Sequence, residues 1–238
     1  MASRYRWSRI VIFSAILSAG TQALGQHCVA PASFSGLVPT KIDYENSRAR
    51  TDYHLFLLSW APVFCASQSG TPVAQCLSAA PSFVAGGLIP RSQLARREQD
   101  HPRHCIPPMT LSQALLRRNY CLTPSAQFMQ DEWVRYGGCS FANAGEFFDR
   151  IAQLWSSIQQ PDLAALARNS GSLTVAAIRQ SFVTANSRIG LQPRNVIVSA
   201  DAKKRFTGVA ICYDQQFVLT NCPSEGVNDQ NRLKLLLR

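Results

Sequence analysis

The sequence lacks the patterns that mark several protein classes. No apolar run reaches the roughly 20 residues that a membrane-spanning helix needs. No C-x-x-C pair occurs, which argues against the common zinc motifs. Only 16% of the 238 residues are charged and 46% are hydrophobic, so neither a disordered chain nor a fibre is indicated. A globular protein remains, and its length allows one large domain or two small ones.

The N-terminal segment is typical of a secretory signal peptide. Three arginines precede an apolar run over residues 10–17, and the small residues Ala23 and Gly25 stand three and one positions before Gln26. We predict cleavage after Gly25, so that residues 1–25 are a signal peptide and the mature chain is secreted or periplasmic. An uncleaved signal anchor is the alternative.

All eight cysteines follow the predicted cleavage point. An even number of cysteines in an exported chain indicates up to four disulfides rather than a metal site. The sequence therefore predicts a fold stapled by disulfides, with no cofactor and no metal.

Hydrophobic periodicity predicts both strands and helices. The aromatic and apolar run 53–60 ends at Pro62 and is typical of a buried central strand. Within residues 143–159, apolar residues recur at intervals of three and four, and Asn143 with Glu146 resembles a helix cap. Strands are expected at 53–60, 83–88, 195–199, 206–213 and 216–219, and helices at 110–119, 125–136, 143–159, 161–168 and from 172 or 174 to 186.

The remaining segments are expected to be irregular. Residues 26–51 predict an N-terminal arm, and the Pro- and Arg-rich stretch 91–108 predicts a loop. Strands and helices are mixed without strict alternation, and no repeat or linker occurs. The sequence therefore predicts a single α+β domain over residues 52–238.

Four local patterns, in the same order, resemble the ribonuclease T2 family of secreted, histidine-dependent RNA-cleaving enzymes. Together they lie within residues 53–223. The predicted helix that ends in F-V-T-A-N (182–186) also matches the family's pattern before its last strands. The patterns are S-W-A-P-V-F-C (59–65), F-V-A-G-G-L-I-P (83–90), D-E-W-V-R-Y-G-G-C (131–139) and V-A-I-C-Y-D-Q-Q-F (209–217) followed by C-P (222–223). This resemblance implies a central antiparallel sheet flanked by helices.

The resemblance also implies the disulfide pairing. It pairs Cys65 with Cys76, Cys105 with Cys139 and Cys212 with Cys222. Cys28 and Cys121 remain for a fourth bridge.

The family cleaves RNA with two imidazoles, one taking the proton of the ribose 2′-hydroxyl and the other protonating the leaving oxygen. They belong to the blocks H-G-L-W-P and H-E-W-x-K-H-G-x-C. Here Gly86 and Tyr136 stand at the two catalytic histidine positions, and Asp131 stands where a third histidine binds phosphate. Glu132 is retained, and Arg135 replaces the lysine with its charge kept.

These replacements predict a defective catalyst. A tyrosine has an ordinary pKa near 10, glycine has no side chain, and a carboxylate at Asp131 repels phosphate. His101, His104 and His54 are the alternative sources of an imidazole, and His101 with His104 is an alternative metal pair.

The charge is strongly basic, with 24 Lys and Arg against 14 Asp and Glu. Such an excess attracts polyanions without sequence preference. The basic residues gather in the loop after the first block, at the end of the helix that follows, and in one short later run: Arg91, Arg96, Arg97, Arg103; Arg117, Arg118; Lys203, Lys204, Arg205.

Two functions follow from these observations. The leading hypothesis is an exported pseudoenzyme that binds RNA, another polyanion or another exported protein. The alternative is a weak or active endoribonuclease that forms 2′,3′-cyclic phosphates, in which His101, His104 or His54 replaces the missing groups.

Overall fold

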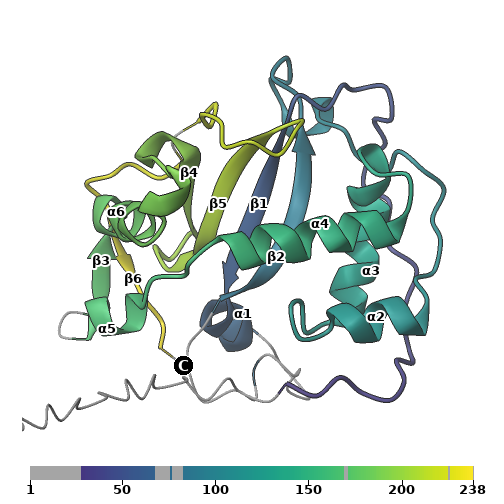
Figure 1. Cartoon of the computed structure of the whole chain (residues 1–238), viewed down its shortest axis with the longest axis horizontal. Helices are drawn as coiled ribbons and strands as arrows, with labels where there is room; N and C mark the ends of the chain where they lie inside the picture. The colour runs from purple at the N-terminus through teal and green to yellow at the C-terminus, as the bar shows by residue number, and fades with distance from the viewer. Residues whose placement is uncertain (1–27, 68–75, 77–82, 169–170, 225, 238) are drawn as a thin grey trace, which may run out of the picture.

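A computed structural model describes residues 28–67, 76, 83–168, 171–224 and 226–237 of the chain. Its centre is an antiparallel four-stranded sheet with the strand order β2-β1-β5-β4 (Figure 1). The predicted signal peptide lies outside the described residues. The strands are β1 (Tyr53–Trp60), β2 (Phe83–Arg91), β4 (Val196–Ala200) and β5 (Phe206–Asp214).

The central strand β1 was predicted correctly, and its burial alternates. Phe56, Leu58 and Trp60 are buried, whereas Leu57 and Ser59 are partly exposed. Because the period is two residues, alternate side chains lie on opposite faces of the sheet. One face therefore packs into the core, and the other contributes Ser59 to the site described below.

Helices cover the sheet and flank both of its edges (Figure 1). Helix α4 crosses in front of the sheet, α2 and α3 lie on the side of β2, and α5 and α6 lie on the side of β4. The helices are α1 (Ala61–Ser67), α2 (Gln113–Asn119), α3 (Ala126–Arg135), α4 (Ala144–Ser157), α5 (Leu163–Ala167) and α6 (Val175–Ala185).

Helix α4 shows why the sequence prediction succeeded. Its apolar stripe, which includes Phe147, Ile151 and Leu154, is buried in the core. At its start, the Asn143 side chain accepts from the Glu146 backbone N–H at 3.0 Å and donates to the Glu146 carboxylate at 2.8 Å. These bonds satisfy groups that a helix end leaves free.

Three features were not predicted. The first is helix α1, which begins directly after β1. Pro62 lies in its first turn, where the missing backbone N–H of proline breaks no helical hydrogen bond. A small second sheet pairs β3 (Ser172–Thr174) with β6 (Arg232–Lys234). Short 3-10 turns also occur at Glu98–Asp100, Gly137–Cys139, Ser187–Ile189 and Pro193–Asn195.

The strand predicted at 216–219 is wrong. The Asp214 carboxylate accepts the backbone N–H groups of Gln216 and Val218, both at 2.9 Å. Those donors are therefore used in a turn, and pairing is reduced to an isolated bridge between Tyr213 and Leu219.

The four predicted disulfides are all present. They are Cys28–Cys121, Cys65–Cys76, Cys105–Cys139 and Cys212–Cys222. The chain therefore has a disulfide-stapled α+β fold, as predicted.

The N-terminal arm is irregular, as predicted, but it is held along its length. Cys28 ties its start to the end of α2. Further along, the Gln113 side chain exchanges two hydrogen bonds with the Phe34 backbone, and Gln127 does the same with Val38. The arm is thus positioned to reach the second sequence block at the end of α3.

Candidate functional site

The first block lies on β2, where two adjacent glycines are closely packed. The register with β1 shifts here, since Leu57 pairs with Gly87 and Leu58 with Ala85. A Cβ at Gly86 would overlap the Oγ of Ser59, and one at Gly87 would overlap the Glu132 carboxylate. Gly87 also has a φ of 115°, which disfavours other residues. The space beside Gly86 is thus filled by Ser59.

Glu132 joins the two blocks, because its carboxylate packs against Gly87. The residue is 5% exposed, and its Oε2 has no hydrogen-bond partner. Burial raises the pKa of Glu132 to about 8, although the positive charges of Arg135 and Arg103 oppose the rise. The side chain is therefore protonated at neutral pH and covered by protein.

Asp131 and Arg135 lie on neighbouring turns of α3. The Asp131 carboxylate accepts from the Thr40 hydroxyl at 2.7 Å and from the Gln127 amide at 3.0 Å. Arg135 approaches its other oxygen at 3.9 Å, and the Arg135 Nε is buried without a partner. The carboxylate at the predicted phosphate position is therefore already bound by the arm.

Tyr136 follows the last residue of α3 and is held by Arg103, a contact that the sequence analysis did not predict. Its hydroxyl accepts from Arg103 at 2.6 Å, and the guanidinium lies 4.9 Å from its ring centre and 5.0 Å from that of Tyr44. Asp43 binds the same guanidinium through both oxygens, at 2.8 and 2.6 Å. Burial raises the pKa of Tyr136. The position predicted to correspond to the second histidine thus holds a fixed, neutral phenol.

The alternative histidines lie near the site but face other partners. The His101 Nδ1 accepts from the Ser92 backbone at 3.1 Å. The His104 Nε2 is 3.3 Å from Asp43, and its backbone N–H bonds to the Arg135 carbonyl. Among the described residues, no imidazole hydrogen-bonds to the side chain of Glu132 or Arg135.

His54 is a core residue. Its Nε2 is 3.0 Å from the Ser140 hydroxyl, and its ring stacks on Phe217 at 4.8 Å. Burial lowers the pKa of His54 to about 4, so it is neutral over most of the physiological range.

The described part of the chain also holds no cluster of three side chains suited to a metal ion.

A pocket of about 280 Å³ lies beside Gly86, and sequence reasoning missed it. It is mainly apolar, with a few hydroxyl groups. Its described lining is Ser59, Trp60, Ala61, Val63, Phe64, Val84, Ala85, Gly86, Thr123, Ser125, Phe128 and Thr207. No pattern in the sequence marks this pocket, because its lining comes from segments far apart in the chain. The size is close to the lower end of the range for ligand pockets.

No helix within the described residues is long and apolar enough to cross a membrane. Beside the second block, a smaller pocket of about 270 Å³ is lined by residues that include Glu45, His104 and Cys105.

Comparisons with known proteins found one similar sequence and several similar structures. No protein-family model matches the chain. A protein of Haemophilus influenzae named probable ribonuclease is 28% identical over 191 residues, which is 76% of this chain and 64% of that protein.

Two solved structures show the same arrangement. The S-like ribonuclease trichomaglin superposes with a TM-score of 0.62 at 16% identity, over 79% of this chain and 98% of its own. RNase NT, solved with 5′-AMP, superposes with a TM-score of 0.60 at 15% identity, over 79% of this chain and 100% of its own. The chain thus has a ribonuclease T2-like fold, and its sequence is similar to that of a protein named ribonuclease.

Proposed function

We propose that the chain is an exported ribonuclease-like protein that binds single-stranded RNA without cleaving it. The observation that carries this proposal is the state of the two histidine positions. Gly86 has no side chain and its space is taken by Ser59, whereas the Tyr136 hydroxyl is bound to Arg103. RNA cleavage through a 2′-hydroxyl needs a base and an acid in one transition state, and neither position supplies one.

The binding part of the proposal rests on the pocket. Trp60, Phe64 and Phe128 give it aromatic walls, and Ser59 and Thr207 add hydroxyl groups. Aromatic side chains stack on nucleobases at about 1–3 kcal/mol per base, with little sequence preference. Removal of the predicted signal peptide takes away three arginines and no acids, so the formal charge falls from +10 to +7, and this excess adds attraction to phosphate.

Export is part of the same proposal. Four disulfides link all the described cysteines, and such bridges persist in oxidising compartments. Together with the predicted signal peptide, they support a secreted or periplasmic protein.

A cleaving enzyme is the second candidate, and one observation favours it besides the name of the relative. With a pKa of about 8, Glu132 carries a proton at neutral pH, as a general acid must. However, Glu132 is 5% exposed and packs on Gly87, so the proton cannot reach an RNA oxygen without a rearrangement.

The test measures binding and cleavage on the same purified exported chain. We expect a labelled oligonucleotide of single-stranded RNA to bind with a steep salt dependence and to remain intact. The variant Phe64→Ala should weaken binding by about 1–3 kcal/mol, because it removes an aromatic wall of the pocket. Leu94→Ala is the matched control, since Leu94 is 86% exposed and lies outside the pocket. Equal affinities for the two variants would contradict the assignment of the pocket.

A further inference from the structure

The arginine-rich loop, which the sequence singled out as a polyanion site, is largely neutralised by its own acids. Arg91 pairs with Glu98 at 2.7 Å, and Arg97 pairs with Asp100 at 2.9 Å. Arg103 is held by Asp43, as described above. Three of the four arginines therefore already have carboxylate partners, and the attractive surface must lie elsewhere.

A second basic group lies at the turn between β4 and β5. The Asp201 carboxylate accepts from the backbone N–H groups of Lys203 at 3.0 Å and of Arg205 at 2.9 Å, and it pairs with the Arg205 side chain. Lys204 adopts a φ of 55° at the tip. The turn is thus held in one shape, and its two lysines are exposed.

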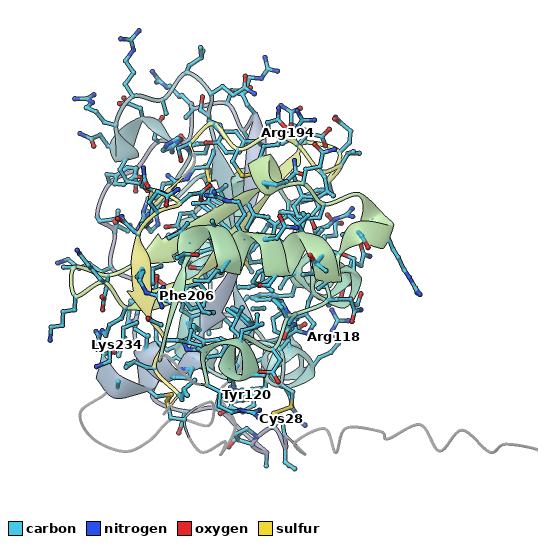
Figure 2. All side chains as sticks on the ribbon, turned by 90° about the vertical axis from the view of Figure 1, so that its left-hand side faces the viewer. Cys28, Arg118, Tyr120, Arg194, Phe206 and Lys234 are labelled. Atoms are coloured by element: carbon cyan, nitrogen blue, oxygen red, sulfur yellow. A yellow bond between two sulfur atoms is a disulfide. The ribbon has the colours of Figure 1, made fainter. Side chains whose placement is uncertain are left out.

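Strand β6 lies directly beside this turn and adds more positive charge. The Lys234 backbone N–H donates to the Lys204 carbonyl at 2.9 Å, and Lys234 also forms a bridge with Arg205. Arg232 and Lys234 are exposed on β6, on either side of the buried Leu233. Figure 2 shows Lys234 close to Phe206, the first residue of β5.

The turn and β6 together carry five basic side chains and one carboxylate. Within the described part of the chain, Lys203, Lys204 and Lys234 have no ion-pair partner. An unpaired lysine remains available for an external phosphate, whereas a paired arginine must first give up a carboxylate. We call this surface, made of Lys203, Lys204, Arg205, Arg232 and Lys234, the lysine surface.

The lysine surface adjoins the pocket beside Gly86. Thr207 lines that pocket, and Arg205 lies two residues before it, about 7 Å along an extended chain. Phe206 between them is fully buried, whereas Arg205 and Thr207 are partly exposed. Both side chains therefore lie on the same side of the extended chain, so Arg205 of the lysine surface is a near neighbour of Thr207 of the pocket.

We infer that the lysine surface binds the phosphates of a single-stranded RNA that places one base in the pocket. The inference rests on the proposed function and deepens it, because it assigns the path of the strand. RNA is favoured over an anionic membrane, because the surface lies near a pocket with aromatic lining residues and its own exposed residues are basic rather than apolar.

The test compares two charge-matched double variants of the exported chain. The test variant is Lys204→Gln with Lys234→Gln. The control is Arg96→Gln with Arg117→Gln, which removes two exposed charges away from this surface. Binding of a labelled oligoadenylate of about 12 nucleotides is measured between 50 and 200 mM salt.

We expect the test variant to lose affinity about tenfold or more at 50 mM salt, and its salt slope to fall by about 1.4, or 0.7 for each phosphate contact. The control should keep the slope of the unmodified chain. A second variant, Lys203→Gln with Lys204→Gln, should behave as the test variant does, which separates loss of contacts from a local change in β6.

Equal slopes for test and control would overturn the lysine surface and leave the proposed function standing, provided that the unmodified chain binds RNA. If the unmodified chain binds no RNA, the result contradicts both the lysine surface and the proposed function. A test variant that loses binding to phosphatidylglycerol vesicles but keeps its affinity for RNA would overturn the inference in favour of a membrane surface.

Discussion

Replacing Glu132 by glutamine should make the protein more stable at alkaline pH. The carboxyl is 5% exposed, packs on Gly87, and has an oxygen without a hydrogen-bond partner. Burial raises its pKa from the usual 4.5 to about 8. The folded chain therefore holds this proton where the unfolded chain has released it.

The direction of the effect follows from proton linkage. Between pH 4.5 and about 8 the folded state binds more protons at this site, so the free energy of unfolding falls as the pH rises. The difference between a pKa of about 8 in the folded chain and 4.5 in the unfolded chain lowers the free energy of unfolding by at most about 5 kcal/mol once Glu132 is ionised. Glutamine resembles the protonated acid and does not ionise, so the variant escapes this loss.

Urea unfolding measured from pH 4 to 9 checks the prediction. The difference between Glu132→Gln and the unmodified chain should be small near pH 4 and grow to a few kcal/mol by pH 8. Glu45→Gln, which neutralises an exposed carboxylate, is the control and should stay within about 0.5 kcal/mol throughout. A difference that does not change with pH would refute the buried, protonated state of Glu132.

Three further predictions concern the second block. Asp43→Asn should destabilise the fold by about 1–3 kcal/mol with an unchanged m-value in urea, because it leaves the buried Arg103 guanidinium without its carboxylate; no loss would show that the arm does not hold the block. Replacing both Cys105 and Cys139 by serine should cost about 2–4 kcal/mol, measured by thermal unfolding, and stability equal to that of the unmodified chain would show that the bridge is dispensable. Asp131→His should strengthen RNA binding by removing a negative charge from the second block, and an unchanged or weaker affinity would show that RNA does not pass the second block.

Local patterns predicted much of the fold. The stripe of α4 and the central run of β1 each have one strong period, and the structure follows both. The segment 216–219 shows where this fails, since its apolar residues suit a strand but the Asp214 side chain takes the backbone donors. Strand β6 is only three residues long, and it pairs with β3 about 60 residues away, which no local pattern encodes.

The site was predicted in part. Resemblance placed Gly86, Tyr136 and Glu132 in two blocks, and the structure brings those blocks together where Glu132 packs on Gly87. The bonds that close the site come from elsewhere in the chain. Arg103 lies in a loop and Asp43 in the arm, so their meeting depends on the tertiary path of both segments and not on spacing.

Cleavage of RNA by the unmodified exported chain tests the central claim most directly. The account predicts no 2′,3′-cyclic phosphate above the uncatalysed background, and partial recovery only when Gly86→His and Tyr136→His are combined with Ser59→Ala, which clears space for the first imidazole. An acid and a base each contribute about 10²- to 10⁴-fold, so one histidine alone should restore little. Robust cleavage by the unmodified chain, lost in His101→Ala or His104→Ala, would contradict the account.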